Sequence, residues 1–144
     1  MKTAEYEGAI IPAAAVPPAV KPRFSETWTP TTANVALAER NLKPFLERAA
    51  KNHAQASGVI QANQDVTFEG LPKLIASLST YKRQYVGVKY GPSLHILIHG
   101  RPDDPAHSWR SEFRISYESG CQYWWYEFNV TDQKVLEFTC QDLS

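Results

Sequence analysis

Histidine and aspartate side chains cluster in the second half of the chain, where they could act as metal ligands. His95 and His99 are four residues apart on an expected strand, which separates them by roughly 13 Å, too far to share one metal ion. His99, Asp103, Asp104 and His107 form a looser set. Their spacing fits no defined metal motif, and Asp-Asp between two prolines is typical of a turn. We therefore predict neither a metal site nor a cofactor.

The sequence offers no established setting for a catalytic nucleophile. It contains no G-x-S-x-G, P-loop or G-x-G-x-x-G motif. Cys121 follows a glycine and has no histidine close to it in the sequence. Glu112, Glu127 and Glu137 could pair on neighbouring strands, but exposed carboxylates lack the burial that raises the pKa of a general acid. A non-enzymatic protein is the favoured interpretation, with an enzyme kept open.

Cys121 and Cys140 are the only two cysteines, and both fall in the last two expected strands. A disulfide between them would imply an oxidising compartment. Strict strand alternation places them on opposite sheet faces, so only a bulge at Ser119-Gly120 or a frayed end would bring them together. Two reduced, packed cysteines are the alternative, and the pattern leaves both open.

Residues 81–87 (YKRQYVG) concentrate two phenols, two cations and an amide where helix gives way to sheet. As a junction, Arg83 and Gln84 would satisfy carbonyl groups at a helix end, and this interpretation is preferred. As a site, the segment would form the mouth of a pocket. The candidates for that pocket are Tyr81, Arg83, Tyr85, His99 and Trp109.

An amphipathic helix is expected to begin after the hydroxyl-rich stretch at residues 29–32, which offers N-cap groups. Its apolar stripe consists of Val35, Ala38, Leu42, Phe45, Leu46 and Ala49. Pro44 predicts a kink or two abutting helices. The opposite face should be solvated and without chemistry, with i, i+4 pairs at Glu39–Lys43 and Glu47–Lys51; its charged residues are Glu39, Arg40, Lys43, Glu47, Arg48 and Lys51.

The rest of the chain predicts a short helix from Pro72 and then strands, after a polar connection at 58–70. The apolar residues expected on the buried side of that helix are Leu71, Leu74, Ile75 and Leu78. Alternation predicts five strands, at 84–90, 94–99, 109–118, 122–130 and 135–140. This order indicates an α+β domain over residues 31–144, with N-terminal helices on one face of a curved antiparallel sheet of about five strands, cystatin-like or NTF2-like in outline.

Residues 1–30 contain half of the ten prolines and show no usable periodicity. They predict a proline-rich extended arm. A disordered tether is the preferred interpretation, and the alternative is an arm that lies along the domain through Ile10, Ile11, Val16 and Phe24.

Alternation divides the expected sheet into two faces. The face toward the helix should carry Phe113, Ile115, Tyr117, Trp124, Tyr126, Phe128, Val130, Leu136, Phe138, Leu94, Ile96 and Ile98. The other face should be mainly solvated and carries Arg110, Glu112, Arg114, Tyr123, Trp125, Glu127, Asn129, Glu137, Thr139, His95, Leu97 and His99. Tyr123 and Trp125 beside Arg110 and Arg114 have the composition of a protein-binding hot spot. The preferred alternative is that the arm or a helix covers these two rings.

Composition limits the partners and the compartment. Fifteen Lys+Arg balance fifteen Asp+Glu over 144 residues, which argues against a nucleic-acid binder. The apolar stretch at 9–20 is interrupted by prolines and is too short for a membrane span. It does not predict a signal peptide, so a cytoplasmic protein and a mature exported one both remain.

Several short motifs occur in a distinctive order: W-T-P-T at 28–31, Val35 with Glu39 and Leu42, Y-x-R-Q-Y-V-G at 81–87, W-R at 109–110, and an aromatic strand that ends near Phe138. Over roughly residues 28–140 this order resembles a group of small, mostly exported bacterial proteins that are uncharacterised. The resemblance implies a compact α+β domain and a periplasmic or secreted location, with the cytoplasm as the alternative. It supplies no activity and no residue roles.

Two functions from different classes fit these observations. The first is a non-enzymatic module, such as an inhibitor or immunity-type protein, that binds another protein through Tyr123, Trp125, Arg110 and Arg114. The second is a small-ligand or enzymatic pocket between helix and sheet. A cavity there that contains one of the pocket candidates favours the second function, and a filled core excludes it.

Overall fold

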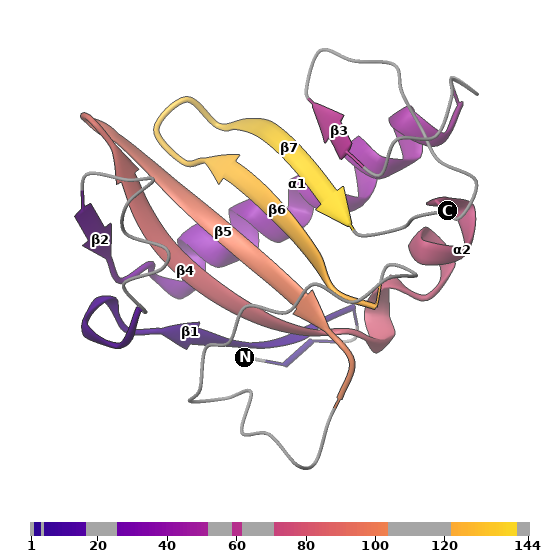
Figure 1. Cartoon of the computed structure of the whole chain (residues 1–144), viewed down its shortest axis with the longest axis horizontal. Coiled ribbons are helices and arrows are strands. Elements are labelled where there is room, and N and C mark those ends of the chain that lie inside the picture. Colours follow the sequence, from indigo (N-terminus) through magenta and orange to yellow (C-terminus); the bar gives the residue numbers. More distant parts are fainter. Residues whose placement is uncertain are drawn as a thin grey trace.

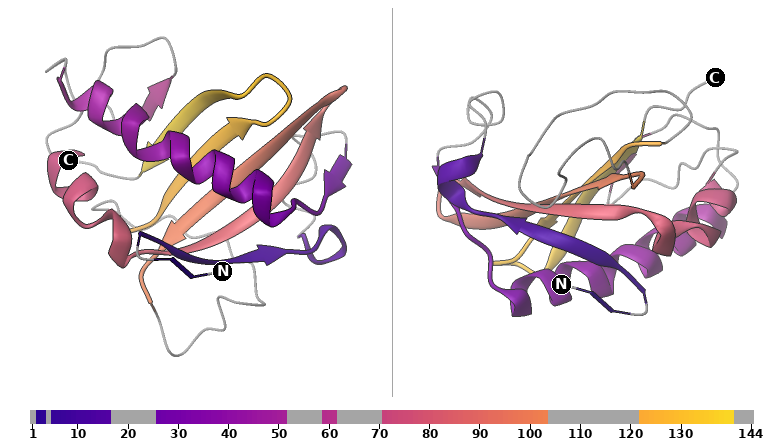
Figure 2. Two further views of the ribbon diagram at one scale, coloured as in Figure 1. Left: turned by 180° about the vertical axis from the view of Figure 1, so that it is seen from behind. Right: turned by 90° about the horizontal axis from the view of Figure 1, so that it is seen from below.

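One long helix crosses one face of a mixed β-sheet in the computed structural model of the protein (Figure 1, Figure 2). The structure describes residues 2, 3, 5–16, 26–51, 59–61, 71–103 and 122–140. In chain order the elements are β1 (Glu7–Ile11), η1 (Ala13–Ala15), β2 (Glu26–Trp28), α1 (Thr32–Lys51), β3 (Val59–Gln61), α2 (Leu71–Ala76), η3 (Leu78–Thr80), β4 (Lys82–Tyr90), β5 (Ser93–Arg101), β6 (Trp124–Asn129) and β7 (Lys134–Cys140).

Helix α1 begins at a reciprocal cap and runs through Pro44 without a break. The Thr31 hydroxyl accepts a hydrogen bond from the backbone N–H of Asn34 at 3.1 Å, and the Asn34 side-chain oxygen accepts one from the N–H of Thr31 at 3.1 Å. Pro44 and Arg40, whose carbonyl loses its helical donor, are both exposed, so water can replace that bond. The alternative of two abutting helices is therefore wrong, whereas the expected N-cap and apolar stripe are confirmed.

The seven strands that the structure describes form a single sheet in the order β1-β4-β5-β6-β7-β3, with β2 paired beside β4. The hairpins β4–β5 and β6–β7 and the pair β5–β6 are antiparallel, as alternation predicts. The turn between β4 and β5 is two residues long, and Gly91 has the positive φ of +56° that such a turn requires before a proline.

None of the helices in the described part of the chain combines the length and the apolar character that a bilayer-spanning segment needs.

The N-terminal arm is part of this sheet. Strand β1 runs parallel to β4, with Glu7 opposite Lys82 and Ile11 opposite Val86, and β2 pairs antiparallel with the remainder of the same edge of β4. The expected antiparallel sheet is therefore present, and the arm adds one parallel strand that makes the whole sheet mixed. A disordered tether is wrong for residues 7–16 and 26–28, because Ile11 and Val16 are buried as the alternative required; Phe24 lies outside the described residues.

Strand β2 is fixed to the sheet by its tryptophan. The indole Nε1 of Trp28 donates to the carbonyl oxygens of Val88 and His95, at 3.0 and 3.1 Å. The Trp28 backbone comes so close to β4 that a Cβ atom on Gly87 would lie 2.2 Å from the Trp28 carbonyl oxygen. A glycine at position 87 is what permits this approach.

Two further expectations about strands need correction. Strand β3 lies within residues 58–70, which alternation had left as a polar connection, and it pairs with β7 at the sheet edge. The expected strand at 109–118 lies outside the described residues. Strands β5 and β6, which a simple five-strand meander would separate, pair directly from His95–Asn129 to Gly100–Trp124.

The main core lies between α1, α2 and the sheet. It contains the expected apolar side chains of both helices and of β5–β7, among them Leu42, Leu74, Ile98, Tyr126 and Phe138. Two expected residues are exceptions: Leu94 is half-buried outside this core, and Leu136 is 37% exposed, with Val135 buried in its place. The register shifts at Glu127/Phe128, so that Phe128 pairs with Val135. Because of this bulge, Leu136 no longer lies on the face that strict alternation predicts for it. Phe113, Ile115 and Tyr117 lie outside the described residues.

The far face of the sheet is buried to a large extent, and the expectation of a mainly solvated face is wrong there. A second apolar cluster brings Ile11 and Val16 of the arm against Val86, Val88 and Leu97. Several polar side chains of this face are also buried: Gln84, His95, His99, Arg101 and Asn129. The arm thus provides part of a second layer.

Candidate functional site

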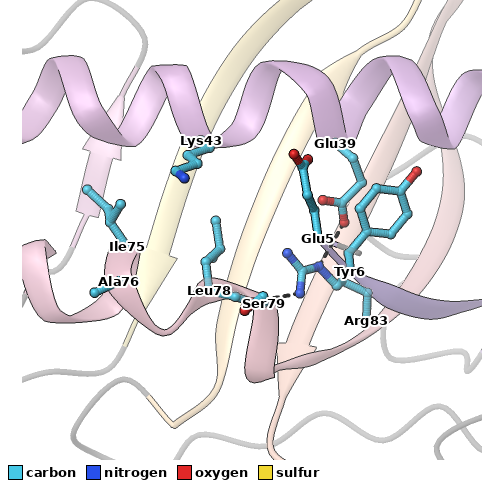
Figure 3. Close-up of a pocket in the computed structure, with 9 residues that line it drawn as sticks. All are labelled: Glu5, Tyr6, Glu39, Lys43, Ile75, Ala76, Leu78, Ser79 and Arg83. Atoms are coloured by element: carbon cyan, nitrogen blue, oxygen red, sulfur yellow. Dashed lines mark hydrogen bonds and ion pairs between the residues drawn. The ribbon is translucent and has the colours of Figure 1, made fainter. Parts of the chain in front are cut away.

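A cavity of about 260 Å³ opens between α1, η3 and the start of β4 (Figure 3). Segments far apart in the sequence meet there, because β1 pairs with β4 and α1 crosses the same sheet. Its lining consists of Glu5, Tyr6, Glu39, Lys43, Ile75, Ala76, Leu78, Ser79 and Arg83. Arg83 is one of the pocket candidates from the sequence.

A buried ion pair forms the inner wall of the cavity. Nε of Arg83 donates to Oε1 of Glu39 at 2.8 Å, and the Tyr85 hydroxyl donates to the same oxygen at 3.0 Å. Nη1 of Arg83 donates to the carbonyl oxygens of Leu78 and Tyr81, at 2.8 and 2.9 Å. The side chains of Arg83 and Glu39 are only 2% and 5% exposed. The junction hypothesis thus holds for Arg83, which is held rigidly by helix, connection and strand.

The aromatic rings around Arg83 add to this fixation. Its guanidinium carbon lies 5.8 Å from the ring centroid of Tyr6 and 5.5 Å from that of Trp124, both within the range of a cation–π contact. Tyr81 packs edge-to-face on Trp124, with ring centroids 5.9 Å apart. The cation is therefore enclosed by aromatic and carbonyl groups as well as by Glu39.

Burial shifts the pKa values of the ionisable side chains in this site. It raises the pKa of the Glu39 carboxyl, although the charge of Arg83 and the hydrogen bonds from Arg83 and Tyr85 act in the opposite direction. The negative charge of Glu5 raises the pKa of Glu39 further. Burial, followed by the charge of Glu39, also raises the pKa of the hydroxyls of Tyr85 and Tyr6. Both phenols therefore remain protonated near neutral pH.

The role of Glu39 corrects the expectation of a solvated helix face without chemistry. Glu39 is buried and pairs with Arg83 instead of Lys43. A signal for this was present, because Val35, Glu39, Leu42 and Leu46 follow one another at helical spacing, so that Glu39 belongs to the apolar stripe. Glu5 and Tyr6 carried no such signal, since only the pairing of β1 with β4 brings them to the cavity.

The other pocket candidates do not all meet at this cavity. Tyr85 reaches it through Glu39, and Tyr81 contributes its carbonyl oxygen to Arg83. His99 lies on the opposite face of the sheet, where its Nδ1 is 3.3 Å from Oε1 of Gln84. Burial, followed by the positive charge of Arg101, lowers the pKa of His99 to about 3. Trp109 lies outside the described residues.

Tyr123 and Trp125 lie on the far face of the sheet beside His99. Their ring centroids are 5.8 and 4.3 Å from that of His99, and both rings are half-buried. Trp125 also packs against the cluster that contains Ile11 and Val16, so the arm covers part of this surface. Arg110 and Arg114 lie outside the described residues.

Among the described residues, the other candidates from the sequence do not form a second site that is as well defined as the cavity. Nδ1 of His95 and Oε2 of Glu127 are 2.6 Å apart, so the carboxylate expected to be solvated has a specific partner. Within the ranges that the structure describes, no group of three or more potential metal ligands is present; Asp104 and His107 lie outside them. Cys140 is buried at the end of β7 and Cys121 is outside the described residues, so the bridge stays a prediction.

The cavity thus combines a fixed ion pair, a second carboxylate, protonated phenols and one apolar wall. Such groups can hydrogen-bond a small polar molecule and neutralise its charge. Compared with known proteins, the chain matches no family model, no curated protein and no solved structure.

Proposed function

We propose that this protein binds a small polar molecule in the cavity between α1, η3 and β4. The observation that carries the proposal is the buried Glu39–Arg83 ion pair in the wall of that cavity. Of the two functions compatible with the sequence, ligand binding is the one that requires a pocket candidate such as Arg83 inside a cavity. Its volume of about 260 Å³ corresponds to roughly nine water molecules at ~30 Å³ each, which suits a metabolite.

Stability alone gives a poor account of the ion pair. Removing two charges from water costs free energy, and an apolar pair of similar volume is often equally stable or more stable. Glu39 and Arg83 nevertheless lie beside a well-packed apolar core. A role in recognising a charged or hydrogen-bonding ligand explains why both charges are present.

Filling the cavity tests this proposal. Ala76 lines the cavity and is exposed on α2, so Ala76→Trp would occupy the space without removing either charge. Ala36 is exposed on α1 and does not line the cavity, so Ala36→Trp is the matched control. In ligand-observed NMR with amines, carboxylates, phosphates and sugars, we expect a compound that binds the wild type and A36W but not A76W. If no compound separates the two variants, the cavity is not a binding site.

A second candidate is a protein-binding module, such as an inhibitor or immunity-type protein, that uses the far face of the sheet. The half-buried rings of Tyr123 and Trp125 favour it, because they retain accessible surface while stacked on His99. Arg110 and Arg114 would complete this surface. Replacing both rings with Ala should abolish partner capture in a pull-down and leave the circular dichroism melt unchanged; a collapsed melt would show that the rings serve packing.

We further propose a cystatin-like or NTF2-like outline and a periplasmic or secreted location, with the cytoplasm as the alternative. One long helix across an open sheet supports the outline.

The proposed location rests on the motif order described above and on a bridge between Cys121 and Cys140. Intact mass should rise by two hydrogen atoms on reduction, and an unchanged mass would reject the bridge.

A further inference from the structure

One end of the cavity presents a carboxylate oxygen without a donor. Arg83 and Tyr85 both donate to Oε1 of Glu39, and within the described part of the chain nothing donates to Oε2. Glu39 is 8% exposed and lines the cavity together with Glu5. Figure 3 shows Glu5, Glu39, Tyr6 and Arg83 gathered at this end. Because Arg83 neutralises Glu39, the charge of Glu5 makes this end acidic.

A protonated amine complements such an end. An ammonium group has three donors and no acceptor, and Oε2 of Glu39 and the carboxylate of Glu5 supply acceptors only. Bonds between an ammonium and a carboxylate are charge-assisted and among the stronger hydrogen bonds in proteins. The protonated hydroxyl of Tyr6 leaves its ring uncharged beside them, which also suits a cation.

The other end of the cavity is basic and apolar. Lys43 follows Glu39 by four residues on α1, an axial rise of about 6 Å. It is exposed, and among the described residues it has no ion-pair partner. Figure 3 shows Lys43 on the side of Ile75 and Ala76, which provide the apolar wall. An anionic group with a hydrocarbon body fits this end.

We infer that the ligand is a small zwitterion of the amino-acid class, with its ammonium group at Glu5 and Oε2 of Glu39, its hydrocarbon body on Ile75 and Ala76, and its carboxylate at Lys43. This inference rests on the proposed function, that a small polar molecule binds in the cavity. This arrangement of charges disfavours simple anions, because the carboxylate of Glu5 repels them at one end of the cavity. It also disfavours neutral molecules, because they leave Glu5 and Lys43 without a counter-charge.

Three unbranched probes test the parts of this inference: n-butylamine carries only the ammonium group, butyrate only the carboxylate, and 6-aminohexanoate carries both. In NMR titrations of the full chain we expect 6-aminohexanoate to bind most tightly, n-butylamine next, and butyrate about tenfold more weakly or not at all. Glu5→Gln should weaken both amines about tenfold. Lys43→Gln should weaken 6-aminohexanoate and leave n-butylamine unchanged. Glu47→Gln and Lys73→Gln, at exposed positions outside the lining, are the matched controls.

The outcomes separate this inference from the function on which it rests. If butyrate binds more tightly than n-butylamine, or if Glu5→Gln has no effect, the ammonium assignment is wrong. Cavity binding survives that result as long as Ala76→Trp abolishes the observed binding. If none of the three probes binds, the zwitterion is overturned, and the wider compound set compared in A76W and A36W decides whether the cavity binds any ligand.

Discussion

At the scale of single residues, Arg83 joins several separate parts of the site. It bonds Glu39, the first residue of η3 and the connection to β4, and it lies against two aromatic rings. Each of these groups loses its donor or its counter-charge if the guanidinium is removed. Arg83 is therefore the residue at which the structure of the cavity is most sensitive to substitution.

Replacing Arg83 with Met should lower the free energy of unfolding by about 3–5 kcal/mol at neutral pH, because Glu39 is left as an uncompensated buried charge. Adding Glu39→Gln in the same chain should recover part of the loss, since no charge then remains buried. Urea denaturation measures both changes. Arg40→Met, at an exposed position of α1, is the control and should stay within about 0.5 kcal/mol. Equal losses for Arg40 and Arg83 would contradict the role of the ion pair.

His99 predicts a second residue-scale effect, on the pH dependence of stability. Burial and Arg101 lower its pKa from 6.5 to about 3, so the unfolded chain binds a proton at a higher pH than the native protein does. The contribution of neutral His99 is therefore complete above pH 6.5 and is lost as the pH falls toward 3, by up to about 1.4 kcal/mol per pH unit. His99→Gln should remove this part of the slope in denaturation curves measured across that range. Parallel curves for the wild type and H99Q would refute the assignment.

At the scale of secondary-structure elements, the bulge between β6 and β7 decides which side chain of β7 enters the core. Val135 is 8% exposed and Leu136 is 37% exposed, although strict alternation from Phe138 would bury Leu136. The extra residue reverses the two faces locally.

The bulge can be tested with two neighbouring substitutions. Val135→Ala should cost about 1–3 kcal/mol of unfolding free energy, because it leaves a cavity in the core. Leu136→Ala removes the larger side chain but should cost less than Val135→Ala, because Leu136 is 37% exposed and Val135 only 8%. Thermal and urea denaturation compare the two. A larger loss for Leu136 would mean that β7 follows the uninterrupted alternation.

Alternation and helical spacing were sufficient to find α1, α2 and β4–β7, because each has a long run of regularly spaced apolar residues. They could not find β1, β2 and β3. These strands are short, lie at the sheet edges or carry alanine and glycine, and gain their stability from partners far away in the sequence. The bulge at Glu127/Phe128 was missed for a related reason, since a register shift leaves no trace in residue type.

Only some residues of the candidate site could be predicted from the sequence. Arg83 was identified because cations and phenols are concentrated around it, whereas Glu39 was assigned to solvent by its residue type although its spacing placed it within the apolar stripe. Glu5 and Tyr6 reach the cavity only through the parallel pairing of β1 with β4. That pairing joins residues about half a chain length apart, and local patterns hold no information about it.

At the scale of the whole molecule, the arm and the domain form one structure. Ile11 and Val16 close the far face of the sheet, while Glu5 and Tyr6 on the same segment close the cavity on the helix side. The arm therefore links the two faces of the sheet, and loss of β1 should affect both.

Substitutions at two adjacent isoleucines test whether the arm folds with the domain. Ile11 is fully buried, and Ile11→Ala should cost about 2–5 kcal/mol. Ile10 is half-buried, so Ile10→Ala is the matched control with a smaller expected loss. Far-ultraviolet circular dichroism and tryptophan fluorescence should report a single shared transition for each variant. An arm that behaves as an independent tether would leave the transition midpoint of I11A unchanged.

The parallel pairing of β1 with β4 also orders events during synthesis. The ion pair between Glu7 and Lys82 joins residues 75 positions apart, so β1 leaves the ribosome long before its partner strand exists. At ~5–20 residues per second the wait amounts to about 4–15 s. Closing such a long loop is slow in comparison with forming α1 or the β4–β5 hairpin. The first strand of the chain is therefore among the last to join the sheet, and the cavity takes its final shape only when it does.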